Sequence, residues 1–154
     1  ANSKGENIVK GDNVMKGYYK RPKETAKVIK NGWLHTGDIG VFDEEGYLYI
    51  VGRIKNVIIT GGLNVYPEEI EEILRSHPDV EDVLVLPRRH EALGEVPIAH
   101  VVIKKGSKVS SNQLLRFCKE RLEIQKIPSE IVMVEKIEKT YNGKVRRVSR
   151  YDNE

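Results

Sequence analysis

The sequence predicts an α+β protein with two parts, a mostly β segment at residues 1–53 and a compact unit at residues 54–154. After residue 54, runs rich in Val and Ile alternate with two amphipathic helix patterns in the order β-α-β-β-α-β. Before it the strand patterns are short, and about fifty residues are too few to bury a core of their own. The 154 residues are 39% hydrophobic, which suits a globular fold.

Short elements are expected in the first part. Strand-like runs occur at residues 8–10 and 17–19. Residues 23–30 favour a short helix, and the Asn-Gly pair at residues 31–32 is typical of a helix end. An Asp-Glu-Glu-Gly turn between two strand-rich runs then predicts a β-hairpin at residues 40–51.

The second part begins with a strand at residues 57–60 that ends at a glycine pair. Pro67 then opens a helix, because Pro fits the first helical position and the glutamates that follow fit the positive end of the helix dipole. Ile70 and Leu74 belong to an apolar stripe that would pack this helix on a sheet, and Pro78 closes it.

A second helix and three more strands complete the predicted unit. The helix spans residues 112–122, and Ser110 with Gln113 fits a capping box at its start. Leu114 and Cys118 share its apolar face. Val- and Ile-rich runs predict strands at residues 80–86, 96–104 and 131–137.

Composition excludes several functional classes. The single cysteine, Cys118, excludes an internal disulfide and a Cys-rich metal site, and its place on an apolar helix face favours a small buried hydrophobe over a nucleophile. The four histidines show no metal-ligand spacing and no Ser-His-Asp arrangement, so we expect no metal site and no hydrolase. No apolar run approaches the roughly 18–20 residues of a membrane helix. No signal-peptide pattern is visible either, so we expect a cytoplasmic protein without a membrane span.

Charge is only mildly asymmetric. The net charge is +3, with basic residues gathered at residues 144–150. This cluster is either a solvated tail or an anion contact. No aromatic platform stands beside it, so we expect no nucleic-acid binding.

A few residues have the types needed to hold a nucleotide. The carboxylate of Asp38 can accept hydrogen bonds from both hydroxyls of a ribose, or it caps a turn. Arg53 can bridge a carboxylate and a ribose or phosphate, or form a surface ion pair. Gly61 and Gly62 allow a thin ligand to approach the backbone, or form a plain hairpin turn. Lys144 can stabilise charge developing in a transition state, or is simply solvated.

The order of these pieces resembles a known family. Gly-Trp-Leu-His-Thr-Gly-Asp at residues 32–38 precedes Gly-Arg-Ile-Lys-Asn at residues 52–56 and Gly-Gly-Leu-Asn-Val-Tyr-Pro-Glu-Glu-Ile-Glu at residues 61–71. Together they closely resemble the C-terminal part of the adenylate-forming superfamily. That group holds AMP-forming acyl-CoA synthetases, firefly luciferase and peptide-synthetase adenylation domains, and a fatty-acid–CoA ligase is the nearest likeness.

The resemblance implies a role for each matching residue. Asp38 and Arg53 match the family's contacts to the ribose of ATP or AMP. Lys55 matches the hinge about which a small mobile C-terminal domain swings. Gly61 and Gly62 match the loop lining the tunnel for the pantetheine arm of CoA. Lys144, in a Gly-Lys pair, matches the catalytic lysine of acyl-adenylate formation.

The resemblance also implies what this chain lacks. Residues 1–53 match the end of a large N-terminal domain that would hold the phosphate loop, the acyl pocket and Mg²⁺, and we expect that domain to be the partner of residues 54–154. The expected substrates are a carboxylic acid, ATP and CoA. We expect this piece alone to be inactive and to self-associate through exposed strand edges. The alternative is a non-catalytic module of the same fold that binds nucleotide or a carrier protein.

Overall fold

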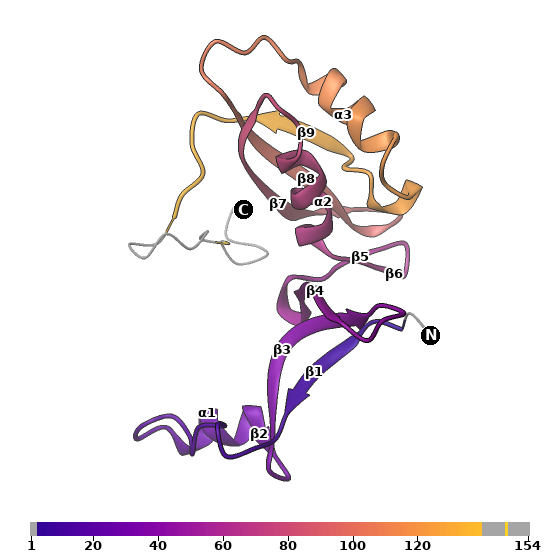
Figure 1. Ribbon diagram of the computed structural model, residues 1–154. Coiled ribbons are helices and arrows are strands. Elements are labelled where there is room, and N and C mark those ends of the chain that lie inside the picture. The colour runs from indigo at the N-terminus through magenta and orange to yellow at the C-terminus, as the bar shows by residue number, and fades with distance from the viewer. Residues whose placement is uncertain (1–2, 140–146, 148–154) are drawn as a thin grey trace. The chain divides into compact units, whose positions relative to one another are not determined.

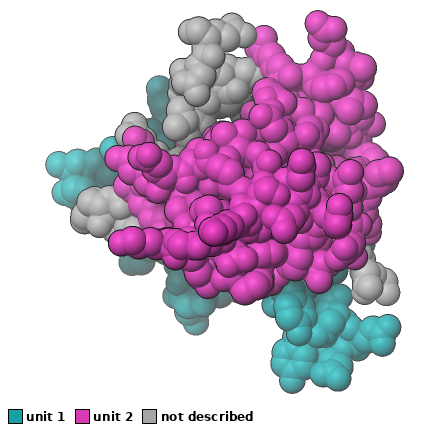
Figure 2. Space-filling model, turned by 90° about the horizontal axis from the view of Figure 1, so that it is seen from above, with its two compact units in different colours: residues 1–55 teal, residues 56–154 magenta. Residues whose placement is uncertain are grey.

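The structure is a computed structural model that describes residues 3–139 and 147 (Figure 1). The chain divides into two compact units, Ala1–Lys55 and Asn56–Glu154, which are coloured separately in Figure 2. The predicted α+β class is confirmed, since small sheets and short helices make up both units. None of the helices in the described part of the chain has the length and apolar character of a membrane span.

The first unit is a four-stranded antiparallel sheet built around one long strand. β3 (Trp33–Phe42) pairs with each of the other strands, which are β1 (Gly5–Val9), β2 (Ile29–Lys30) and β4 (Leu48–Arg53). A seven-residue helix, α1 (Pro22–Val28), precedes β2 and buries no residue.

The hairpin predicted at residues 40–51 is confirmed as the β3–β4 pair. Asp43 builds its turn, because Oδ1 accepts hydrogen bonds from the Glu45 and Tyr47 N–H groups at 3.0 and 2.8 Å. The strand predicted at residues 17–19 is wrong: that segment is a turn, in which the Tyr18 N–H donates to Thr25 Oγ1 at 2.9 Å. A side-chain hydroxyl there satisfies a backbone donor that a strand would have given to a neighbour.

The Asn-Gly pair at residues 31–32 does not end the helix, because α1 stops before Ile29. Asn31 and Gly32 have φ of 51° and 78°, and Lys30 pairs with Trp33 across them. Two consecutive residues with positive φ make the two-residue hairpin turn whose twist matches antiparallel strands, and Asn-Gly is its commonest sequence. The last two residues predicted as helix are therefore strand β2.

The second unit is a five-stranded sheet covered by two helices. Its strands are β5 (Ile58–Thr60), β6 (Leu63–Val65), β7 (Val80–His90), β8 (Gly94–Ile103) and β9 (Glu130–Met133). The helices are α2 (Pro67–Arg75) and α3 (Ser111–Lys119), and single 3₁₀ turns lie at Ile54–Asn56 and Ile124–Lys126. β8 pairs antiparallel with β7 and β5 and parallel with β9. β6 was not predicted.

One hydrophobic core joins the helices to the sheet. Alternate residues of β7 and β8 bury their side chains with the apolar faces of both helices; the fully buried members include Val83, Val85, Ala99, Val101, Ile70, Leu74, Leu114 and Cys118. Each buried Val, Leu or Ile contributes roughly 1.5–3 kcal/mol. Cys118 is the small buried hydrophobe that was predicted, and burial raises the pKa of its thiol to about 11.

The start of α3 matches its sequence signal. Ser110 Oγ accepts a hydrogen bond from the Gln113 N–H at 3.3 Å, and Gln113 Oε1 accepts one from the Ser110 N–H at 2.9 Å. This reciprocal capping box satisfies backbone donors that the helix itself leaves unpaired.

Candidate functional site

Asp38 and Arg53 lie opposite one another on β3 and β4. Arg53 Nε donates to Asp38 Oδ1 at 2.5 Å, and the Asp38 and Arg53 side chains are 29% and 48% exposed. An ion pair this exposed contributes at most about 1 kcal/mol to stability. Its geometry holds the carboxylate in one orientation while leaving it accessible to a ligand.

A bulge fixes the backbone at Asp38. Between two regular stretches of the β1–β3 ladder, residues 36–38 stand opposite the single residue Asn7. Thr36 Oγ1 donates to the Asn7 carbonyl at 2.8 Å and accepts a hydrogen bond from the Asp38 N–H at 3.1 Å. Such bulges re-aim side chains and are common beside active sites. The hydroxyl of Thr36 thus holds the bulge that presents Asp38.

A carboxylate on β1 fastens the same segment. Glu6 Oε1 accepts from the Gly37 N–H at 3.1 Å, and Oε2 pairs with His35 Nδ1 at 2.8 Å. The hydrogen bond from His35 lowers the pKa of Glu6 below its ordinary value of 4.5. Glu6 therefore stays ionised at neutral pH and anchors the backbone beside Asp38.

Lys55 follows Arg53 closely and is the last residue of the first unit. Both residues line a groove of about 440 Å³ within that unit. Its other basic lining residues are Lys27, Lys30 and His35, and Glu6 also lines it. Three lysines and one arginine against a single carboxylate in this lining favour an anionic ligand.

Gly61 and Gly62 form the turn between β5 and β6. Their φ values of 57° and 82° lie in the left-handed region, and Thr60 pairs with Leu63 across them. The Gly61 N–H donates to the Leu93 carbonyl at 2.8 Å, and a Cβ on Gly61 would lie 3.4 Å from Leu93 Cδ2. The pair is thus a hairpin turn packed closely against the loop that precedes β8.

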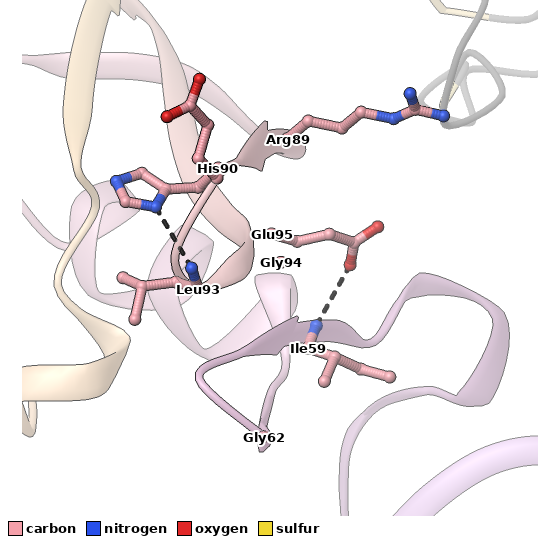
Figure 3. A pocket seen from close by; sticks show the side chains of 8 residues that line it. Ile59, Gly62, Arg89, His90, Leu93, Gly94 and Glu95 are labelled. Atoms are coloured by element: carbon pink, nitrogen blue, oxygen red, sulfur yellow. Dashed lines mark hydrogen bonds between the residues drawn. The ribbon is translucent and has the colours of Figure 1, made fainter.

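A groove of about 750 Å³ opens beside this turn (Figure 3). The residues that line it are Ile59, Gly62, Arg89, His90, Glu91, Leu93, Gly94 and Glu95. Glu95 Oε2 accepts from the Ile59 N–H at 3.1 Å, and His90 Nδ1 accepts from the Leu93 N–H at 3.3 Å. These hydrogen bonds use polar groups of the lining residues, and the exposed surface of the groove is mostly apolar. It suits a slender, mainly apolar ligand.

Lys144 lies outside the described residues. Arg147, three positions later, is described: it donates to the Val85 carbonyl and to the carboxylate of Glu71. Within residues 3–139 and 147, no group of three or more His, Cys, Asp and Glu side chains could hold a metal ion.

Comparison with known proteins identifies the family. The model of the AMP-binding enzyme C-terminal domain matches residues 69–144, which include α3, most of α2 and strands β7, β8 and β9 of the larger sheet. Residues 69–144 belong to the AMP-binding enzyme C-terminal domain family. The resemblance drawn from residues 32–71 is therefore confirmed, and it lies mainly upstream of the matched domain.

Two curated relatives of this chain are CoA ligases. The 2-succinylbenzoate–CoA ligase of Geobacillus kaustophilus (strain HTA426) is 46% identical over 93% of this chain and 29% of the relative. The long-chain-fatty-acid–CoA ligase of Bacillus subtilis (strain 168) is 45% identical over 93% of this chain and 26% of the relative. The chain thus spans less than a third of the length of either relative.

Solved structures give the same fold. The o-succinylbenzoate CoA synthetase of Bacillus subtilis, in complex with the acyl-adenylate intermediate OSB-AMP, aligns with a TM-score of 0.87 at 40% identity. ATP-bound MatB from Rhodopseudomonas palustris aligns with a TM-score of 0.83 at 38% identity. Each alignment covers 93% of this chain and 29% of the solved chain.

Three residues around these sites escaped sequence reasoning. In the sequence Glu6 and Thr36 are ordinary polar residues. The structure shows that their side chains accept hydrogen bonds from the backbone of the bulge at Asp38. Glu71 is one of several glutamates at the start of α2, and only the fold buries it. A signal existed for Thr36, which lies in the quoted Thr-Gly-Asp stretch; no local signal marks Glu6 or Glu71.

Proposed function

We propose that this chain is the C-terminal part of an ATP-dependent, AMP-forming carboxylate–CoA ligase. The ion pair of Asp38, on a strand bulge, with Arg53, two residues before Lys55, is the observation that carries the proposal. The family match and the ligases and synthetases among its relatives support it. Because the chain spans less than a third of those relatives, the reaction is assigned to the longer enzyme that contains it.

The first half-reaction joins a carboxylic acid and ATP into acyl-AMP and pyrophosphate. Asp38 would accept hydrogen bonds from the ribose hydroxyls, since a carboxylate has room for about four such bonds and Arg53 holds it by one oxygen. Lys144 would stabilise the negative charge that develops as the carboxylate oxygen attacks the α-phosphate. Mg²⁺ is expected to accompany ATP, and no described residue of this chain is assigned to it.

In the second half-reaction the CoA thiol attacks acyl-AMP, forming acyl-CoA and releasing AMP. The groove beside Gly61 and Gly62 would take the pantetheine arm, a slender chain with both apolar and amide groups, because apolar and polar residues together line this groove. Lys55, at the junction between the units, would be the pivot for a rotation of the second unit. That rotation would present Lys144 to the reactants in the first half-reaction and this groove in the second. Such alternation closes water out of each step.

The acid is left to experiment. Relatives named for 2-succinylbenzoate and for long-chain fatty acids are 46% and 45% identical to this chain, so sequence identity does not distinguish between these two acids as its substrate. Our sequence-based preference for a fatty acid therefore stays a proposal. One solved relative is an amide bond synthetase from Marinactinospora thermotolerans, so the acceptor also needs testing.

The test is pyrophosphate release by the complete enzyme, screened over carboxylic acids that include 2-succinylbenzoate and long-chain fatty acids. At least one acid should give ATP- and CoA-dependent thioester. The Asp38→Asn variant should raise the KM for ATP, because an amide offers the ribose one acceptor oxygen instead of two. Failure of every acid to release pyrophosphate would refute the proposal.

A further inference from the structure

A partly buried ion pair in the second unit, between Glu71 and Arg147, has no role in the proposed function above. Glu71, on α2, is only 6% exposed. Its carboxylate accepts a hydrogen bond from the Val85 N–H at 2.8 Å and pairs with Arg147 at 2.9 Å. Arg147 also donates to the Val85 carbonyl at 2.9 Å. We call these three residues the β7 clasp.

The clasp occupies a strand edge. β7 ends the β6-β5-β8-β7 order of the sheet, and Val85 faces Ala99 of β8 on its other side. An edge strand exposes unpaired backbone N–H and C=O groups. Here both groups of Val85 are taken by side chains, the N–H by Glu71 and the carbonyl by Arg147. Glu71 and Arg147 therefore provide the hydrogen bonds that a neighbouring strand would otherwise give to Val85.

Stability alone is a weak reason to keep this arrangement. Desolvation raises the pKa of Glu71, and the charge of Arg147 opposes that rise without cancelling it. A buried ion pair is often no more stabilising than apolar residues of similar size. What the pair does provide is geometry, because a planar guanidinium bonded to a carboxylate and a carbonyl has one orientation.

The clasp ties a distant part of the sequence to the body of the unit. Arg147 stands 62 positions after Val85 and 76 after Glu71. Lys144 precedes Arg147 by three residues, and three residues of chain span at most about 11 Å. Because Arg147 is bonded to β7, the chain length between the two residues sets the greatest distance that Lys144 can lie from Arg147.

We propose that Arg147 and Glu71 are positioning residues for Lys144 in the adenylation half-reaction. The inference rests on the proposed function of Lys144 and adds the means by which it is held. Misplacing a catalytic group by about 1 Å can cost about 100-fold in rate. Loss of the clasp should thus lower the adenylation rate while leaving the groove beside Gly61 and Gly62 intact.

The experiment measures both half-reactions in the complete enzyme. Adenylation is followed by pyrophosphate release, and thioester formation is followed from supplied acyl-adenylate and CoA. Arg147→Ala should lower kcat for adenylation about 10- to 100-fold, change the KM for ATP little, and leave thioester formation within about twofold. Arg147→Lys keeps the charge without the two-pronged geometry and should fall between, as should Glu71→Gln, which keeps an acceptor for Val85.

A matched control comes from the same strand. Arg88 of β7 pairs with Glu130 at 2.6 Å, in an exposed position away from the clasp. Arg88→Ala also removes one arginine–carboxylate pair, and it should leave adenylation within about twofold. A loss as large as that of Arg147→Ala would overturn the proposal, because it would show a general sensitivity of the sheet.

The Lys144→Ala variant separates the catalytic role proposed for Lys144 from the positioning role proposed for Arg147. If Arg147 acts through Lys144, the double variant should adenylate no more slowly than Lys144→Ala alone. A further loss in the double variant, or equal loss of both half-reactions in Arg147→Ala, overturns the positioning role. So does normal adenylation by both Arg147→Ala and Arg147→Lys when Lys144→Ala is impaired. Normal adenylation by Lys144→Ala instead refutes the proposed catalytic role of Lys144, and this inference with it.

Discussion

The two units of this chain differ sharply in how they bury apolar side chains. In the second, twelve buried residues from five strands and two helices form one core. Among the described residues of the first, Ile39 is the single buried apolar side chain, whereas eleven large hydrophobic side chains are exposed. Backbone pairing and a few side-chain hydrogen bonds hold the first sheet, and a sheet with no apolar face covered is marginal in water. The comparison teaches that the second unit contains a core able to stabilise it, whereas the first unit leaves most of its large apolar side chains exposed.

The largest effect should come from separating the units. Residues 56–154 expressed alone should unfold cooperatively, because their core lies within that range. Residues 1–55 alone should show no cooperative transition, because they bury almost no apolar surface. Circular dichroism during a urea titration distinguishes the two. A cooperative, monomeric first unit would contradict the comparison.

The next effect concerns a single side chain in the core. Leu74 is fully buried, so Leu74→Ala should lower the free energy of unfolding by about 2–5 kcal/mol. Ile124→Ala is the control, since Ile124 is 85% exposed, and its effect should stay within about 0.5 kcal/mol. Urea unfolding of residues 56–154 measures both. Equal effects would mean that the core is not packed as described.

Periodic patterns predicted the second unit well because its core imposes them. Ile70 with Leu74, and Leu114 with Cys118, repeat at helical spacing and do pack on the sheet. Strand β6 was missed because three residues after a glycine pair carry too short a pattern to recognise. Its existence depends on the turn at Gly61 and Gly62, which the sequence also allowed to be a simple strand end.

Local signals were ambiguous in the first unit. The Asn-Gly pair at residues 31–32 suits a helix end and a hairpin turn equally, and the pairing of Lys30 with Trp33 decides between them. The pairing of Asp38 with Arg53 likewise requires the register of β3 and β4, which residue spacing does not give. Family resemblance selected both residues. The burial of Glu71 required the complete fold.

The pKa shifts of Glu71 and Glu6 have opposite directions, so the two units should differ in how their stability depends on pH. In the second unit, burial raises the pKa of Glu71 above its ordinary 4.5, so the folded state binds more protons than the unfolded state above pH 4.5. Stability should therefore fall as pH rises from 4.5 through the folded-state pKa. In the first unit, the bond from His35 lowers the pKa of Glu6, so its contribution is present above pH 4.5 and is lost as pH falls through the folded-state pKa.

Carboxyl chemical shifts measured by NMR over pH would report the two titrations directly. Glu71 should titrate above 4.5 and Glu6 below it. Glu71→Gln should remove the loss of stability above pH 4.5 from residues 56–154, and His35→Phe should bring the titration of Glu6 back toward 4.5. Shifts in the same direction for both glutamates would show that burial and hydrogen bonding do not act on them as described.

The smallest effect compares the helix starts. α3 has a complete capping box at Ser110, whereas Arg21 at the start of α1 makes no side-chain cap hydrogen bond. Ser110→Ala should lower the free energy of unfolding of residues 56–154 by about 1 kcal/mol, because it removes the side-chain acceptor of the Gln113 N–H and leaves it only the Ser110 carbonyl at 3.1 Å. Ser111→Ala, one position later, is the matched control and should change stability by less than about 0.5 kcal/mol. Because α3 carries Leu114 and Cys118 into the core, the loss at Ser110 should appear in the cooperative transition of the whole unit. A loss seen only as local fraying, by faster amide exchange at the start of α3, would show that the cap and the core are not coupled.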